Sequence, residues 1–330
     1  MADAIRHPPN FLGRAVVGVV FGALVYAALA FVADYGRLRG ALYGLSWHIV
    51  PAVLGLASLN YLIRFEKWHY FLRHLGFRVP RKGSLLVFMA GLVMSITPGK
   101  MGEVLKSFLL KRLYGAPVSM TAPAVVVERL TDLVALMVLA AAGGYALTGA
   151  TAALAIGVGL VAGIVSILSI DRLSSLLVRQ ITRFKRLAPG ALKLDQSLKA
   201  ARALVKPRPL LLTSLLSVPA WFCECVGFWL IVAGLGYGAL GLGKLTGIYA
   251  LAAVIGAVSM LPGGLGATEL TVAGLLSASG VPRSEAVAAT LVVRAATLWY
   301  AVAVGGVFLF PLRHAMKRSA SIAAEEGGAS

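Results

Sequence analysis

The sequence predicts an all-α, polytopic integral membrane protein with about six full spans and two re-entrant helical hairpins. Of its 330 residues, 59% are hydrophobic and only 13% are charged. Several apolar runs reach the roughly 20 residues that a helix needs to cross a bilayer core. These runs lack the period-2 alternation of membrane barrel strands. Two further apolar segments are interrupted by glycine and proline in the same way, which predicts helices broken within the membrane.

The uninterrupted apolar runs define the expected full spans. They lie at 11–33, 45–63, 122–147, 151–170, 209–235 and 285–310. No secretory signal with a small-residue cleavage site precedes the first run, so we expect this span to stay in the mature protein.

The two broken segments lie at 84–113 and 245–279. The pieces on either side of each break are too short to cross a bilayer singly. Each segment therefore predicts a re-entrant hairpin whose irregular tip is buried in protein or faces a water-filled cavity. Two tilted crossings joined by a tight turn are the alternative.

The broken segments begin two copies of one pattern, at about 84–147 and 245–310. Pro98-Gly99 interrupts the first copy, and Pro262-Gly263 interrupts the second. A duplicated apolar segment with such a break is the best sequence pointer to the binding site of a transporter.

A Gly-x-Pro turn follows each break, at 115–117 and at 280–282. Each turn leads into an apolar helix with one arginine at the matched place, Arg129 or Arg294, 165 positions apart. The Pro-Gly pairs are 164 positions apart, so the second copy carries one inserted residue.

The distribution of charge predicts how the chain is oriented. The net charge of +18 favours anionic lipid over nucleic acid, because the basic residues lie between and beside the spans. Six basic residues lie between Arg64 and Lys82, and ten lie in the 171–208 connection. Both termini and this connection are therefore predicted to be cytoplasmic. The 171–208 connection is either amphipathic helices on the anionic leaflet or a solvated connector.

This orientation gives the two hairpins a direction. Three spans separate them, so the first enters from the cytoplasm and the second from the outer side. The chain is then a single 1–330 transmembrane domain built as an inverted-topology repeat.

The two matched arginines are the first candidates for substrate binding. A cation within the membrane is costly and usually faces the bundle interior or a cavity. Guanidinium groups suit an anionic lipid phosphate, which they hold by parallel hydrogen bonds. The alternative for Arg129 is an ion pair with Asp132 or with an acid on a hairpin, and Glu128 and Asp132, four apart on one helix face, could hold it internally. Arg294 has no acid within one turn, so we favour ligand contact more strongly there.

Further candidates surround the hairpin tips. Glu103 and Glu269 follow the tips, where they either complement a helix N-terminus or bind a proton or an amine headgroup. Lys100 and Lys106 either attract lipid phosphate or act as topology signals, and Glu224 is a weaker candidate. The tip glycines complete the candidate substrate site: Gly99, Gly102, Gly263, Gly264 and Gly266.

The motifs of nucleotide, metal and hydrolase sites are incomplete. Gly264-Leu265-Gly266 lacks the third glycine of the dinucleotide fingerprint, and Gly99-Lys100-Met101 lacks the Walker spacing. No cluster has metal-ligand spacing, and Cys223 and Cys225 are expected to be buried small hydrophobes. We therefore expect no cofactor, no metal and no enzymatic activity. An integral membrane transferase that uses Glu128 and Asp132 is a distant alternative.

Three motifs in order carry a family resemblance. They are Thr97-Pro98-Gly99-Lys100-Met101-Gly102-Glu103, Glu128-Arg129-x-x-Asp132, and Leu261-Pro262-Gly263-Gly264-Leu265-Gly266-x-x-Glu269. Over nearly the whole chain the sequence resembles the flippase-like transmembrane domain of bacterial lysylphosphatidylglycerol synthases, which also occurs in stand-alone proteins of the UPF0104 type. The resemblance implies an inner-membrane protein that moves phospholipids or lipid-linked molecules between leaflets.

The expected function is therefore lipid translocation by residues that line the two hairpins. The chain ends at Ser330 without a soluble aminoacyl-transferase domain, so we do not expect it to synthesise lysylphosphatidylglycerol. The expected partners are anionic or phosphate-bearing membrane lipids, and a lipid-modifying enzyme is a further candidate. The alternative function is a non-transporting membrane partner that scaffolds or presents lipid to a separate synthase.

Overall fold

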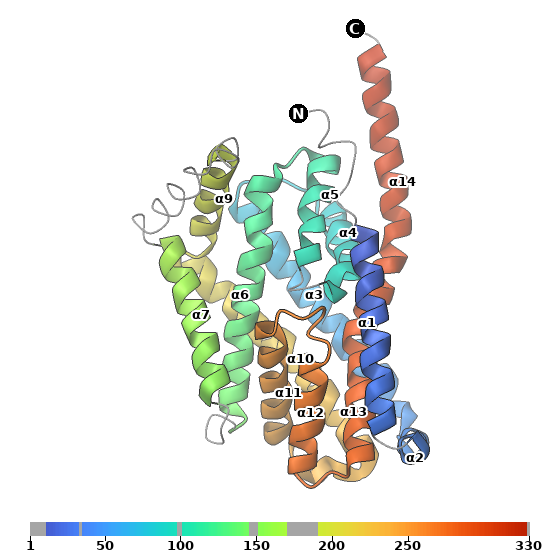
Figure 1. The fold of residues 1–330 in the computed structure, drawn as a ribbon. Helices are drawn as coiled ribbons and strands as arrows, with labels where there is room; N and C mark the ends of the chain where they lie inside the picture. Colours follow the sequence, from blue (N-terminus) through green and yellow to red (C-terminus); the bar gives the residue numbers. More distant parts are fainter. Residues whose placement is uncertain (1–10, 33–34, 98–100, 145–150, 170–190, 329–330) are drawn as a thin grey trace.

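A computed structural model describes residues 11–32, 35–97, 101–144, 151–169 and 191–328. Within these ranges the chain is helical and forms no β-strand, which confirms the predicted all-α class (Figure 1). The α-helices are α1 (Phe11–Val32), α2 (Tyr35–Gly44), α3 (Val50–His74), α4 (Arg81–Gly91), α5 (Leu105–Tyr114), α6 (Val118–Ala142), α7 (Thr151–Ser169), α9 (Ala191–Leu204), α10 (Pro207–Val232), α11 (Leu242–Val258), α12 (Ala267–Ala278), α13 (Arg283–Arg294) and α14 (Tyr300–Gly328).

Three of the described helical stretches are long and apolar enough to cross a membrane. They are Trp47–His74, Pro207–Leu240 and Arg283–Met316, and a fourth is added if Val17–Phe31 and Tyr35–Gly44, bent by 98°, count as one span. The 25-residue α6 falls outside this set although it was predicted as a span. The reason is its three ionisable residues within five positions, which reduce its apolar character.

Both interrupted segments form pairs of helices, α4 with α5 and α11 with α12. The α4 and α5 helices come from one end of the bundle, and the α11 and α12 helices come from the other (Figure 1). The α4, α5 and α12 helices have 11, 10 and 12 residues. At 1.5 Å per residue each rises about 15–18 Å, roughly half of a bilayer core. None of these three can cross a membrane alone.

Glycines make the second tip possible. Gly263, Gly264 and Gly266 have φ angles of 58°, 69° and 86°. Residues with a Cβ rarely adopt these angles, whereas glycine does so without steric cost. The chain can therefore leave α11, cross the 259–266 loop and restart as α12 within the interior.

The α3 helix extends beyond the predicted span of 45–63, as far as His74. Its last turns carry Arg64 and Lys67, which are only 5% and 1% exposed. The predicted end of this span at residue 63 was therefore wrong, because both cations belong to the same helix and are buried. Hydropathy ended the span too early because it scored buried, paired cations as if they faced solvent.

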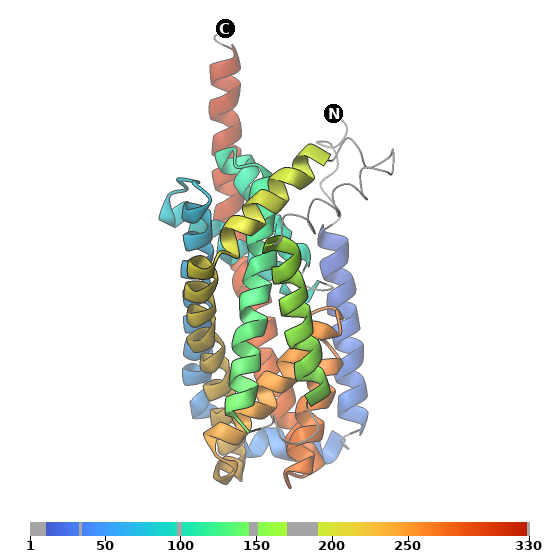
Figure 2. The same cartoon turned by 90° about the vertical axis from the view of Figure 1, so that its left-hand side faces the viewer.

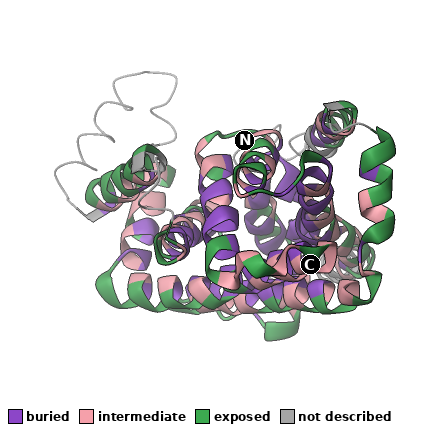
Figure 3. Ribbon diagram, turned by 90° about the horizontal axis from the view of Figure 1, so that it is seen from below, coloured by how far each residue is buried: buried purple, intermediate pink, exposed green. Residues whose placement is uncertain are grey.

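The apolar core follows the inner faces of the helices, and exposed positions gather on the outer faces (Figure 3). One cluster joins α6, α10 and α11 around Phe228 and Ile248, and another joins α3 and α4 around Phe71 and Phe88. Large apolar side chains also remain on the outside, including Leu215 and Val307. An outer surface of this kind suits contact with lipid.

The beginning of α1, the end of α14 and the α9 helix lie at the same end of the bundle (Figures 1 and 2). Within the predicted 171–208 connection, residues 170–190 lie outside the described part of the chain. The described remainder contains α9, which packs on α6 through a 2.8 Å hydrogen bond from Ser119 Oγ to Gln196 Oε1. Ala200 and Leu204 are buried while Lys199 is exposed, so α9 is amphipathic.

Candidate functional site

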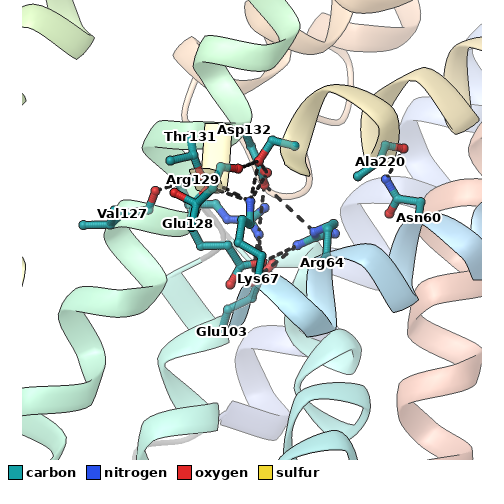
Figure 4. Close-up of polar contacts among 12 residues, drawn as sticks. Asn60, Arg64, Lys67, Glu103, Val127, Glu128, Arg129, Thr131, Asp132 and Ala220 are labelled. Carbon is teal, nitrogen blue, oxygen red and sulfur yellow. Dashed lines mark hydrogen bonds and ion pairs between the residues drawn. The ribbon is translucent and has the colours of Figure 1, made fainter. Parts of the chain in front are cut away.

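A cluster of seven charged side chains, six of them buried and one partly exposed, lies where α3, α6 and the first hairpin meet (Figure 4). We call it the first-hairpin cluster, and it contains Arg64, Lys67, Glu103, Lys106, Glu128, Arg129 and Asp132. Helical spacing explains the contribution of each helix. Arg64 and Lys67 are three apart on α3, and Glu128 and Asp132 are four apart on α6, so each pair shares one face.

Glu128 is the centre of the first-hairpin cluster. Its carboxylate is fully buried and accepts hydrogen bonds from Arg129 Nη2 at 2.6 Å, Lys106 Nζ at 2.7 Å and Arg64 Nη2 at 3.1 Å. Lys106 also contacts Glu103 at 3.2 Å. Glu128 therefore links cations from three separate elements, and burial strengthens each of these charge-assisted contacts.

A second group of contacts surrounds Lys67. Its Nζ donates to Asp132 Oδ1 at 2.5 Å, to Ser217 Oγ at 2.8 Å and to Thr131 Oγ1 at 3.2 Å. Ser217 lies on α10, so this lysine connects α3, α6 and α10. The ammonium is paired and hydrogen-bonded, as a buried cation must be.

Arg129 differs from the other cations of the cluster because 22% of its side chain is exposed. Its contacts to Glu128, Asp132 and Glu103, at 2.6, 3.2 and 3.4 Å, all use Nη2. Its Nε is buried without a hydrogen-bond partner in the described structure. The internal pairing predicted for Arg129 is thus confirmed.

The second hairpin holds the matched arginine in a simpler way. Arg294 Nε donates to Glu269 Oε1 at 2.6 Å, and Arg294 Nη2 donates to the Gly263 carbonyl at 2.7 Å. Glu269 Oε2 also accepts the Gly266 backbone N–H at 2.7 Å, which caps the start of α12. The predicted capping role of Glu269 is confirmed, and the missing partner of Arg294 comes from the second hairpin.

A cavity of about 410 Å³ brings the two arginines together. Arg129 and Arg294 both line it, along with Ser95 before the first break and Gly263 and Gly264 in the second tip. Most other lining residues are apolar, including Leu133, Leu136, Leu160, Ile164 and Ala253. The cavity therefore combines charged groups with an apolar wall, and parts of both hairpins border it.

Glu224 supplies a further acid to this cavity. It lies on α10, is 8% exposed, and accepts a 2.7 Å hydrogen bond from the Tyr249 hydroxyl on α11. Arg64 of the first-hairpin cluster lines the same wall.

The structure brings some of the predicted site residues together and leaves others apart. Glu103, Glu128, Arg129 and Asp132 meet in the first-hairpin cluster, and Glu269 meets Arg294. Two of the predicted glycines make backbone hydrogen bonds within their own hairpins. The Gly102 N–H donates to Thr97 Oγ1 at 2.8 Å, and the Gly266 N–H donates to the Glu269 carboxylate. Lys100 and Gly99 lie outside the described residues.

Sequence reasoning missed two members of the cluster and misjudged a third. Arg64 and Lys67 had been counted as topology signals, and Lys106 had been placed at the flank of the hairpin. All three are buried and paired with acids. The available signal was the spacing of Arg64 and Lys67, which puts both cations on one face of a helix that otherwise continues the apolar span.

No group of three or more His, Cys, Asp or Glu residues in the described part of the chain has the arrangement of a metal site. Cys223 and Cys225 are free and buried.

Comparison with known proteins gives the family. A family model described as the lysylphosphatidylglycerol synthase TM region matches residues 16–305. The chain belongs to this family. A UPF0104 membrane protein of Methanothermobacter thermautotrophicus is 34% identical over 94 residues, which are 28% of this chain and 28% of that relative.

Another UPF0104 membrane protein, from Methanocaldococcus jannaschii, is 26% identical over 224 residues. That match covers 66% of this chain and 93% of the relative. The matched residues 16–305 include all three sequence motifs, and two of these motifs, the one around Arg129 and the one around Gly263, contribute residues to the cavity wall.

Proposed function

We propose that this member of the lysylphosphatidylglycerol synthase TM region family moves a lipid with an anionic phosphate headgroup between the two leaflets of a bilayer. The observation that carries the proposal is the cavity of about 410 Å³ with Arg129 and Arg294 in its wall. Guanidinium groups bind phosphate by paired, charge-assisted hydrogen bonds. The apolar part of the wall suits the first segments of the acyl chains.

The repeat supplies a means of movement. We propose that the α4–α5 and α11–α12 pairs are re-entrant hairpins that enter from opposite membrane faces, with α1, α3, α6, α7, α10 and the α13–α14 stretch as the six crossings. An inverted repeat with a central site can open alternately to either side when its halves exchange conformations. The site would then bind and release lipid without chemical change to it.

The proposed setting is the bacterial inner membrane, with both termini in the cytoplasm. The excess of Lys and Arg in 73–82 and 171–208, which leaves out the buried Arg64 and Lys67, supports this orientation. Membrane lipids are the proposed partners.

The test is lipid movement by the purified protein. Proteoliposomes with a fluorescent phosphatidylglycerol would be treated with a membrane-impermeant quencher, and the initial rate of translocation would be measured. The informative variant is the double change Glu269→Gln with Arg294→Gln. It removes the cation without leaving a buried carboxylate unpaired, which a single arginine change would do.

We expect the double variant to fold and to lose lipid movement by about tenfold or more, because a charge-assisted hydrogen bond contributes about 1.5–3 kcal/mol. The matched control is Arg81→Gln, since Arg81 is an exposed arginine at the start of α4 that pairs with Glu66. An unchanged rate in the double variant would remove Arg294 from the site. A wild-type protein that moves no lipid would instead favour the scaffold function.

A further inference from the structure

The cavity beside the two arginines opens through residues that are all apolar. Among its lining residues, those that are exposed carry no charged or hydrogen-bonding side chain: Val126, Leu160, Ala257, Met260 and Leu261. The charged residues in the same wall are buried, apart from Arg129, whose side chain is 22% exposed. A ligand that reaches the arginines therefore passes apolar side chains first.

Two helices and the second tip border this opening. Val126 lies on α6 and Leu160 lies on α7, while Met260 and Leu261 belong to the 259–266 loop. This loop lies at mid-height of the bundle (Figures 1 and 2), so the opening is on the side of the bundle rather than at one of its ends. Val126 and Arg129 are three apart on α6 and share one helix face. The opening therefore leads directly to the first arginine.

The position of Leu160 along α7 gives the depth of the opening. The α7 helix has 19 residues without a charged side chain, and nine of them lie on either side of Leu160. At 1.5 Å per residue, Leu160 is about 14 Å from each end of the helix. A bilayer core is about 30 Å thick. With α7 as one of the proposed crossings, the opening faces lipid tails rather than water.

Met260 is an unusual residue at the edge of this opening. Its φ angle is 55°, and in the described part of the chain it is the only residue other than glycine with a positive φ. It follows Ser259, the C-cap of α11, at a position where glycine is usual because a side chain is strained there. Its side chain is 61% exposed, so core packing does not account for it. Strained residues of this kind occur at ligand clamps and switch regions.

We propose that the opening is a lateral portal through which a phospholipid enters the cavity from within the bilayer, an inference that rests on the proposed function. The phosphate reaches Arg129, and the acyl chains stay among the apolar side chains of the portal. This route is favoured because it keeps the acyl chains out of water. The occupant of the portal is thus the hydrocarbon part of a membrane lipid, which a water-soluble phosphate compound lacks.

The experiment narrows the portal from two helices at once. The double variant Val126→Trp with Leu160→Trp adds an indole ring on each helix, and proteoliposomes with fluorescent phosphatidylglycerol give the initial rate of lipid movement. We expect the rate to fall by about tenfold or more, because overfilling a confined space is costly. The matched control is Val138→Trp with Val158→Trp, which changes the same two helices at positions that are 51% and 56% exposed but lie outside the cavity wall.

The control variant should move lipid at the wild-type rate. A portal variant that moves lipid as fast as this control would overturn the portal and leave the proposed function standing. A control variant that is slowed as much as the portal variant would also overturn the portal. Wild type that moves no lipid would overturn both proposals.

A second measurement does not require the tryptophan variants to fold. A nitroxide label on Leu160→Cys, with Cys223 and Cys225 replaced by alanine, reports the surroundings of the portal in proteoliposomes. It should collide more often with oxygen, which concentrates in hydrocarbon, than with a water-soluble nickel complex. Its mobility should fall when phosphatidylglycerol replaces part of the phosphatidylcholine, whereas a label on Val158→Cys should not respond.

Glycerol phosphate, which has no acyl chain, should leave the label on Leu160→Cys unchanged. Collision mainly with the nickel complex would overturn the portal, because the opening would then face water. An equal response to glycerol phosphate and to phosphatidylglycerol would also overturn it, because acyl chains would not be the occupant.

Discussion

Replacing Glu128 with glutamine is the most direct test of the first-hairpin cluster. Glutamine keeps the size of the side chain and removes only its charge. In the native protein, Glu128 faces three cations at 2.6–3.1 Å and is fully buried. The change leaves four cations against two acids, so the surplus positive charge of the cluster rises from one to two.

Removing one partner of a buried ion pair costs about 3–5 kcal/mol, because the remaining charge stays buried without compensation. We expect a loss in the free energy of unfolding of about that size. Adding Lys106→Met to Glu128→Gln returns the surplus charge to one, since Lys106 is a direct partner of Glu128 at 2.7 Å. The double variant should therefore recover part of the loss, and the two changes should be non-additive.

The assay is reversible unfolding in mixed micelles with increasing dodecyl sulfate, followed by circular dichroism. Glu66→Gln is the control, because Glu66 pairs with Arg81 at the surface, and an exposed ion pair contributes only about 0–1 kcal/mol. If Glu128→Gln loses no more stability than Glu66→Gln, the cluster does not stabilise the fold through charge pairing and the reasoning fails.

Two further predictions concern glycines, and thermal unfolding measures both against Gly243→Ala, whose added Cβ would meet no atom within 4 Å. Gly264→Ala should lower stability by about 1–2 kcal/mol, since its φ is 69° and the new Cβ would lie 2.9 Å from Thr268 Oγ1; stability equal to that of Gly243→Ala would contradict the described tip. Gly143→Ala should cost about 1–3 kcal/mol through overpacking, because its Cβ would lie 2.4 Å from the Gly247 Cα where α6 meets α11. An unchanged melting temperature there would mean that these helices are farther apart.

The predicted helical class and both interrupted segments needed only local information. Hydrophobicity over a span and the breaks at Pro98-Gly99 and Pro262-Gly263 are properties of neighbouring residues, and they predict helices and breaks without knowledge of the fold. The same holds for Glu269, whose place three residues after Gly266 predicts the observed cap. The count of six crossings and the inverted orientation of the repeats stay predictions, because both depend on where the membrane lies relative to the helices.

The partners of the charged residues could not be predicted in the same way. Arg64 lies 64 positions from Glu128, Lys67 lies 65 positions from Asp132, and Arg294 lies 25 positions from Glu269. A buried cation needs an acid within a few ångströms, but many acids satisfy that need equally well in the sequence alone. Only packing decides between them.

The sequence by itself determined that this chain is a helical membrane protein of the lysylphosphatidylglycerol synthase TM region family, with matched arginines after two broken segments. Hydropathy, turn residues and internal repeats are properties of neighbouring residues, so they can be recognised without a structure. The tertiary structure alone decided that Arg129 is tied into a cluster with Arg64 and Lys67, and that Arg129 shares one cavity with Arg294 and Glu224. Those relations depend on which helix faces are packed together, because electrostatic pairing acts across space rather than along the sequence.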